Sequence, residues 1–258
     1  KTFVDAEDNQ NDFKSVVLPW EVHPERDQEW FRNETKNMSR RQIAQELECN
    51  FNSSGENVLN SEDMEWVHTC VSDPVYRVGF DRNFWIWEKY QDDSKYLLVA
   101  DVARGDGADY SVFHIIKLGT MEIVAEYQGK PSLDLYSDIL FDAGNEYGKC
   151  LLVVENNGIG ISVLEKLILK NYSNLYYSIK GSHEFIEQHK ADYVSNSVPG
   201  FTNSSKTRPL IIAKMEEYIR NKLITVRSSR LFHEFKTFIW HNGRPQAMRS
   251  YHDDLVMA

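Results

Sequence analysis

Two short apolar runs, YLLVADVA at residues 96–103 and CLLVVE at residues 150–155, constrain the fold of this chain most strongly. Runs that are this continuously apolar are typical of strands buried on both faces of a sheet. The first apolar run ends on Asp101 and the second on Glu155, and each is followed by a loop with glycines, RGDG or NNGIG. Either acid alone is compatible with a loop-start carboxylate satisfied by hydrogen bonds. Together they predict a ligand site at the carboxyl ends of buried strands.

The flanking patterns predict an α/β fold. Residues 111–118 and 121–128, separated by Gly119-Thr120, are expected to form two further strands of a meander. Helices are expected over residues 131–148, 158–171, 206–222 and 228–240, short strands over 174–180 and 223–227, and a loop over 180–205. Three successive strands followed by alternating helices and strands favour a mixed sheet flanked by helices.

The pattern before residue 94 is different. VVLPWEVHPERDQEWF, with two prolines and two tryptophans, is expected to be irregular or to form short strands. SRRQIAQELECNF, residues 39–51, is expected to be a helix with Ser39 as its N-cap. QDDS at 91–94 is the expected boundary, which divides the chain into a smaller irregular segment, 1–93, and an α/β domain, 94–258.

Composition excludes several protein classes. Hydrophobic and charged fractions of 41% and 26% are ordinary for a globular protein. No stretch approaches the ~20 apolar residues of a membrane span, and the acidic start KTFVDAEDNQND does not resemble a signal peptide. The three cysteines, Cys49, Cys70 and Cys150, are too dispersed for a CxxC zinc pair and favour a reducing compartment, by default the cytoplasm.

The charge is unevenly distributed along the chain. The net charge is −10, but residues 201–250 hold ten Lys or Arg and three Glu, which gives that segment +7 and leaves −17 for the rest. A basic segment in an acidic protein is either a phosphate-facing surface or a set of solvated helix faces whose acids lie elsewhere.

The C-terminal stretch SYHDDLVMA places Asp253 and Asp254 directly before an apolar segment. Asp is a favoured N-cap, so a helix beginning at about Asp253 is one interpretation. With Asp101 and Glu155, however, the pair supplies the oxygen ligands that hard divalent cations take. Two such ions about 4 Å apart activate a water and stabilise the leaving oxygen of a phosphodiester. The acids therefore predict hydrolytic phosphoryl chemistry without a side-chain nucleophile.

Two more residues are weaker candidates for this site. Asp109 is either a further ligand or a turn residue of DGADYS. His252, beside the aspartates, either moves a proton or contacts phosphate, or is a structural hydrogen-bonding residue.

Four stretches in this order, DVARGDGADYS, VVENNGIG, KTRPLI and YHDDLVMA, resemble the nuclease domain of the large terminase subunits of tailed bacteriophages. PWEVHPERDQEWF and RRQIAQELECNFNSSG resemble the segment that joins the packaging ATPase to that nuclease, so the resemblance covers nearly the whole chain. It implies an RNase H-like fold and a Mg²⁺- or Mn²⁺-dependent endonuclease that cuts double-stranded viral DNA during packaging, with two ions.

The resemblance also implies site residues. The metal-binding acids of the family fall on Asp101, Glu155 and the Asp253–Asp254 pair, with Asp253 favoured as the primary ligand of that pair. Asp109 matches a recurrent acid of the first motif. The KTR segment places Lys206 and Arg208 where contact with DNA phosphates is expected.

The family further implies the phage portal and the small terminase subunit as partners, in the cytoplasm of an infected bacterium, with no membrane. The chain differs from a complete large terminase, because it has no GxxxxGK[ST] phosphate loop and should not hydrolyse ATP as a motor. The family also continues beyond the final aspartates, so a fragment of a longer protein is expected.

Three alternatives stay open on the sequence. A resolvase or transposase of the same fold would not be expected to carry the upstream segment. A docking module of the packaging motor would bind the portal or ATPase without cutting DNA. An actin-like or sugar-kinase ATPase also has a strand-end Asp, but it needs glycine-rich phosphate loops in two halves.

Overall fold

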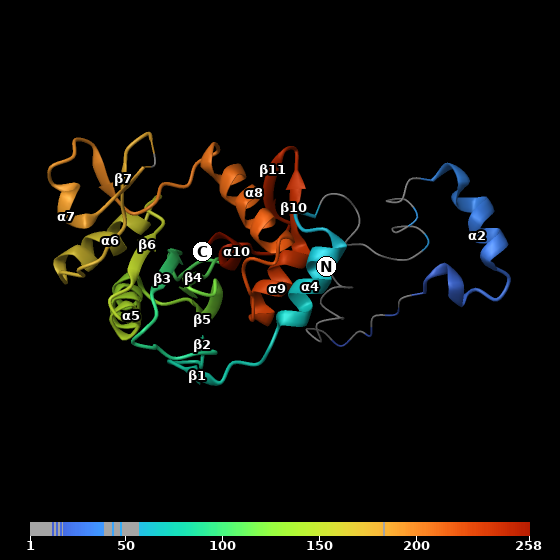
Figure 1. The fold of residues 1–258 in the computed structure, drawn as a ribbon, viewed down its shortest axis with the longest axis horizontal. Coiled ribbons are helices and arrows are strands. Elements are labelled where there is room, and N and C mark those ends of the chain that lie inside the picture. Colours follow the sequence, from blue (N-terminus) through green and yellow to red (C-terminus); the bar gives the residue numbers. More distant parts are fainter. Residues whose placement is uncertain are drawn as a thin grey trace.

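The computed structural model of the chain describes residues 12, 14, 16, 18–38, 43, 47, 57–182 and 184–258. Its centre is a six-stranded mixed sheet in the order β1-β2-β5-β4-β3-β6 (Figure 1). The strands are β1 (Tyr76–Val78), β2 (Phe84–Ile86), β3 (Tyr96–Asp101), β4 (Ser111–Lys117), β5 (Glu122–Gly129) and β6 (Leu151–Val154). Neighbours are antiparallel except β3 and β6, which are parallel. The predicted mixed sheet flanked by helices is confirmed.

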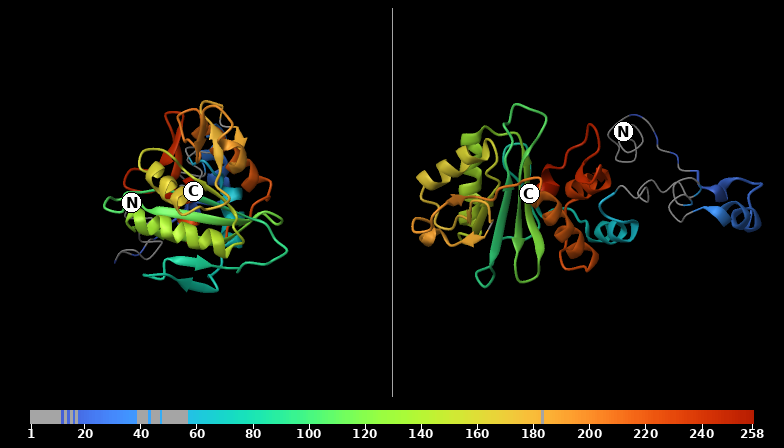
Figure 2. Two further views of the ribbon diagram at one scale, coloured as in Figure 1. Left: turned by 90° about the vertical axis from the view of Figure 1, so that its left-hand side faces the viewer. Right: turned by 90° about the horizontal axis from the view of Figure 1, so that it is seen from above.

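Helices cover both faces of the sheet, which Figure 2 shows edge-on in its right-hand view. One layer is formed by α5 (Leu133–Glu146) and α6 (Gly160–Leu169), and the other by α4 (Ser61–Cys70), α8 (Thr207–Arg220), α9 (Ser229–Thr237) and the short α10 (Asp254–Met257). Successive strand residues point to opposite faces of the sheet. Val112 therefore packs in the hydrophobic core on the side of α9, and Phe113 packs in the core on the side of α5. Two buried faces explain the continuous apolar runs.

The Tyr136 side chain fixes the end of β3 against α5. Its buried hydroxyl lies 2.6 Å from the Val112 carbonyl and 3.0 Å from the Asp101 carbonyl. The helix itself begins where the side chain of Ser132, its N-cap residue, accepts the Leu135 amide at 3.3 Å. Helix α5 therefore holds the strand end that carries Asp101.

The N-terminal part differs from the sequence prediction. The segment 16–31, expected to be irregular or to form short strands, contains η1 (Trp20–Val22) and the first part of α2 (Gln28–Glu34), and η2 (Thr35–Asn37) follows it. Helix α2 forms because Asp27 caps it, accepting the Trp30 amide at 2.8 Å. The helix expected over 39–51 lies outside the described residues apart from positions 43 and 47.

Strands β1 and β2 precede the boundary expected at residue 93, so the sheet includes residues from both predicted segments. Assignment of residues 1–93 to a linker stays a prediction. Of the described helices, none is long and apolar enough to cross a membrane.

The second half of the chain also corrects two expectations. The tract expected as a loop contains α7 (Gln188–Ala191) and, with residues before it, a small sheet of β7 (Tyr177–Ile179), β8 (Phe185–Ile186) and β9 (Ser197–Pro199). The strand expected at 223–227 makes only an isolated bridge, from Thr225 to Glu122.

The helix expected over 228–240 ends at Thr237, and β10 (Phe238–His241) pairs with β11 (Arg244–Ala247). Asn242 and Gly243 turn this hairpin with φ of 50° and 74°. An Asn-Gly pair accommodates two successive positive φ angles, and it favours a hairpin here over a continued helix.

Candidate metal centre

Asp101 and Glu155 lie side by side at one edge of the sheet. β3 and β6 are parallel, with Ala100 opposite Val154. The Glu155 amide donates to the Ala100 carbonyl at 3.0 Å, which continues the pairing just beyond β6. Because parallel strands in register end together, the two acids leave the sheet at the same edge.

Asp254 reaches the same region from α10, which packs against β4 and β3. Its carboxylate accepts the Tyr110 amide, just before β4, at 2.9 Å, and the residue is only 8% exposed. Asp101, Asp109 and Asp254 line one cavity of about 220 Å³. The structure therefore brings together the end of β3, the start of β4 and the start of α10.

Asp253 has different neighbours from Asp254. Its Oδ2 atom pairs with the Arg208 guanidinium and accepts the Ala247 amide at 3.2 Å. Its side chain makes no capping hydrogen bond to α10. Asp253 thus joins β11 and α8 to the start of α10, whereas Asp254 lines the cavity that contains Asp101.

Asp109 and His252 lie next to Asp254 and are more exposed to solvent than it is. The His252 Nδ1 atom is 3.4 Å from Asp109 Oδ1 and 3.8 Å from Asp254 Oδ2. One ligand atom from each of the three residues lies within 4.8 Å of the others. His252 also packs edge-on against the Tyr110 ring. This group can extend a site centred on the buried acids.

Crowding of carboxylates raises several pKa values in this region. Burial, with the nearby Glu155, raises the pKa of Asp101 to about 7. Burial also raises the pKa of Asp254 to about 6, against the lowering effect of the Tyr110 amide. Burial raises the pKa of Glu155 too, although the Asn203 amide and Arg208 oppose the shift. An all-oxygen, mutually repelling donor set suits a hard divalent cation such as Mg²⁺ or Mn²⁺.

The raised pKa values predict a pH dependence of stability. In the folded state Asp101 and Asp254 hold protons up to about pH 7 and 6, well above their usual value of 3.8. We therefore expect the melting temperature of the metal-free protein to rise as pH falls from 8 to 5. Mn²⁺ competes with these protons, so it should raise the melting temperature more at pH 8 than at pH 6. Thermal melts with and without EDTA measure both effects, and a Mn²⁺ effect that is larger at pH 6 would contradict this account.

Ion pairs within the described residues neutralise at least half of the cations of the basic segment. Five of its ten cations have carboxylate partners: Arg208, Lys214, Arg220, Arg227 and Arg230. Lys206 is exposed at the start of α8. Arg208 and Arg244 line a cavity of about 370 Å³ between α8 and the β10–β11 hairpin. The residues predicted to contact DNA thus lie near Asp253, with Arg208 already engaged by it.

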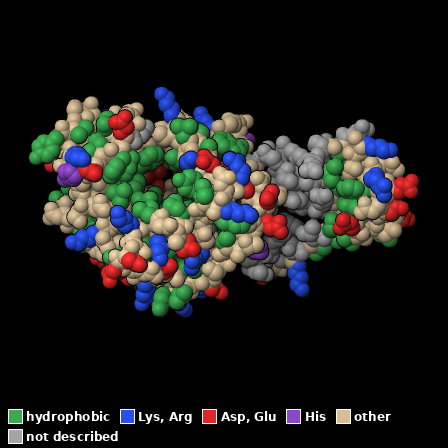
Figure 3. Space-filling model, viewed as in Figure 1, with side chains coloured by type: hydrophobic (Ala, Val, Ile, Leu, Met, Phe, Trp, Pro, Cys, Tyr) green, Lys and Arg blue, Asp and Glu red, His purple; other side chains and the backbone are tan. Residues whose placement is uncertain are grey.

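A third cavity, of about 350 Å³, is lined almost entirely by apolar residues. Glu155 is its one acidic lining residue, and Phe201, Met215 and Met257 are among the others. Figure 3 shows a hollow on one face of the molecule, bordered by hydrophobic side chains with acidic atoms inside. Apolar walls lower the local dielectric and strengthen electrostatic interactions around the acids.

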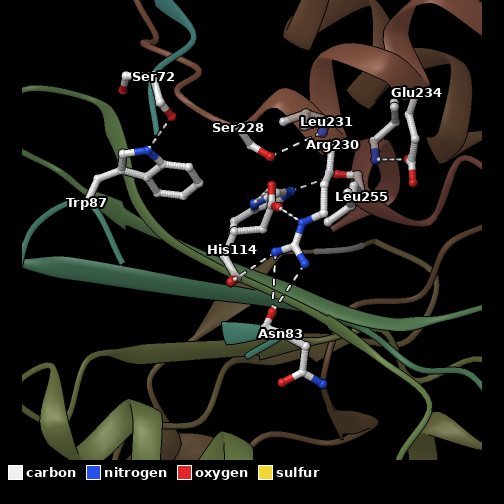
Figure 4. Close-up of polar contacts among 11 residues, drawn as sticks. Ser72, Asn83, Trp87, His114, Ser228, Arg230, Leu231, Glu234 and Leu255 are labelled. Atoms are coloured by element: carbon white, nitrogen blue, oxygen red, sulfur yellow. Dashed lines mark hydrogen bonds and ion pairs between the residues drawn. The ribbon is translucent and has the colours of Figure 1, made fainter. Parts of the chain in front are cut away.

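A buried polar network beside the site was missed in the sequence. Figure 4 shows His114, Arg230, Glu234 and Leu255 meeting beneath α9. His114 and Glu126 face each other across β4 and β5, and the Arg230 guanidinium donates to Glu126 at 2.8 Å. The available signal was the position of His114 and Glu126, each flanked by apolar residues in the interior of the runs SVFHIIKL and MEIVAEYQ, where an apolar residue is expected.

No protein-family model matches the sequence. The fold, however, occurs in solved structures. The large terminase nuclease from thermophilic phage G20c with bound magnesium matches with a TM-score of 0.59 at 20% identity, over 78% of this chain and 93% of that one. Its form with bound zinc matches with a TM-score of 0.53 at 18% identity, over 76% and 94%. The large terminase nuclease domain of Thermus phage P74-26 matches with a TM-score of 0.56 at 18% identity, over 76% and 90%.

The chain therefore has the RNase H-like mixed α/β fold predicted from its sequence. More narrowly, over most of its length it has the fold of the large terminase nuclease domain.

Proposed function

We propose that this chain is a metal-dependent endonuclease that cuts double-stranded DNA during viral genome packaging. The observation that carries the proposal is the convergence of Asp101, Glu155 and Asp254, where burial, together with the nearby carboxylates, raises the pKa of Asp101 to about 7. Structures of the same fold that contain magnesium, cobalt or zinc support it.

In this proposal Asp101, Glu155 and Asp254 hold the divalent cations, and Asp109 is a further ligand. Bound Mg²⁺ or Mn²⁺ supplies Lewis-acid stabilisation of phosphate charge and lowers the pKa of water.

Asp109 orients the His252 ring through Nδ1, which leaves the other ring nitrogen to contact a phosphate or carry a proton. Asp253 is a structural tie between α10, β11 and α8, because Arg208 and the Ala247 amide already occupy its Oδ2 atom.

The DNA backbone would lie across α8 and the β10–β11 hairpin. Lys206 is exposed there, and Arg208 and Arg244 line the adjacent cavity. Contacts from such residues to phosphates favour binding with little sequence preference and strong salt dependence. The resemblance to large terminase subunits supports two further proposed partners, the portal and the small terminase subunit, in the cytoplasm of an infected bacterium.

Nicking of supercoiled plasmid tests the proposal. We expect conversion to open-circular and linear DNA in Mg²⁺ or Mn²⁺ and none in EDTA. Asp254→Asn should abolish cutting, whereas Asp253→Asn should retain Mn²⁺ binding and measurable cutting. Cleavage that persists in EDTA would contradict the metal requirement. DNA binding without any cleavage would favour a non-cutting docking module, and a preference for four-way junctions would favour a resolvase.

A further inference from the structure

The single peptide unit between Leu255 and Val256 is held from both sides by buried side chains. The Leu255 carbonyl lies 2.8 Å from His114 Nε2, and the Val256 amide donates to Glu234 Oε2 at 3.1 Å. His114 is 1% exposed and Glu234 9%. This peptide unit lies one residue beyond Asp254 in the four-residue helix α10, so holding it restrains the backbone that carries the Asp254 carboxylate.

Helix α10 needs these contacts because it lacks its own cap. The first amides of a helix have no partner within the helix and are commonly satisfied by the N-cap side chain. Asp253 occupies the N-cap position, but its side chain pairs with Arg208 instead. Glu234, from α9, accepts the Val256 amide in its place.

His114, the anchor on β4, belongs to the polar network in Figure 4. His114 stands on β4 opposite Glu126 of β5, with 3.6 Å between His114 Nδ1 and Glu126 Oε2. Arg230 donates to Glu126 and lies four residues before Glu234, on the same helix face. The Arg230 guanidinium also packs 3.8 Å above the Trp85 ring. Arg230 and Glu126 therefore connect α9, which carries Glu234, to β5, which pairs with β4 and its His114.

We propose that His114 and Glu234 are positioning residues for the metal centre: by gripping the Leu255–Val256 peptide they hold Asp254 against Asp101. This inference rests on the proposed function for its metal, but its geometric part concerns the chain alone. Substituting a residue that orients a metal ligand weakens metal affinity or activity by about 10- to 100-fold.

The Tyr110 amide provides a metal-free reporter of Asp254. It precedes β4 and donates to the Asp254 carboxylate at 2.9 Å. If α10 loosens, this hydrogen bond opens and the amide exchanges with solvent faster. A general loss of stability would instead raise exchange throughout the sheet.

Four variants separate the roles. Glu234→Met and His114→Phe keep the side-chain bulk but remove the acceptor and the donor, whereas Glu234→Gln and His114→Gln retain them. Thr237→Val is the matched control, since Thr237 is buried in α9 and its hydroxyl bonds only within that helix, to the Glu234 carbonyl at 3.2 Å. Each variant of the 258-residue chain is studied by amide hydrogen exchange without metal and by Mn²⁺ titration.

We expect Glu234→Met and His114→Phe to speed Tyr110 exchange by about 3- to 10-fold, with slowly exchanging amides in β3 unchanged. They should raise the half-saturating Mn²⁺ concentration by about 10- to 100-fold, and the Gln variants should restore most of it. Tyr110 exchange equal to that of Thr237→Val in both variants would overturn the positioning role. Absence of Mn²⁺ binding by the wild-type protein would overturn the proposed function, while Tyr110 exchange still decides the positioning role.

Discussion

Asp101→Asn is expected to abolish metal-dependent DNA cleavage, by more than about 100-fold, and to stabilise the metal-free protein at pH 8. The loss should exceed the 10- to 100-fold effects of residues that merely orient a ligand. The gain in stability follows because the ionised carboxylate is buried beside Glu155 and Asp254, which raises its pKa to about 7. Plasmid nicking and thermal melts measure the two effects on one protein preparation.

Cleavage is expected to fall while the melting temperature rises, and this combination distinguishes the loss of a metal ligand from misfolding, which would lower both. An exposed acid on α5 supplies the control, since Asp142→Asn should change neither cleavage nor melting temperature. Full cleavage activity in Asp101→Asn would remove Asp101 from the metal site. A large loss of stability at pH 8 would show that its carboxylate has a structural role instead.

Arg230→Met is expected to lower the free energy of unfolding by about 3–5 kcal/mol. The reason is that Glu126, which is 0% exposed, loses its charged partner and stays buried. The Asn83 carbonyl also loses the two hydrogen bonds that it accepts from the Arg230 guanidinium, at 3.2 and 3.3 Å. Urea denaturation measures the change.

The double variant Arg230→Met with Glu126→Gln should recover a large part of that loss, because no buried charge is left unpaired. Arg220→Met is the matched comparison, as Arg220 pairs with Glu216 on the exposed side of α8, and such pairs contribute about 0–1 kcal/mol. Equal effects of the Arg230 and Arg220 substitutions would contradict the buried network.

Those features of the site that depend on local pattern could be predicted from the sequence. A continuous apolar run specifies a strand buried on both faces, and its end is where a polar side chain first appears. Asp101 and Glu155 could therefore be placed at strand ends, and the structure adds that the two strands are parallel neighbours. The order of the strands follows from the meander and from the helix between β4–β5 and β6.

Other features depend on contacts that a local pattern does not encode. Asp253 and Asp254 are adjacent and chemically identical, and their surroundings differ through distant partners such as Arg208 for Asp253 and the Tyr110 amide for Asp254. Likewise, the aromatic and β-branched residues of FIW continue the helical pattern of α9, while the strand is specified by the Asn242-Gly243 turn that follows.

A crystal of the protein soaked in Mn²⁺ tests the central claim most directly. The anomalous difference map should show a peak coordinated by Asp101, Glu155 and Asp254, and that peak should disappear in Asp101→Asn. A Mn²⁺ peak bound only by Asp109 and His252, or no peak near Asp101 at a concentration that supports cleavage, would contradict the proposed metal centre.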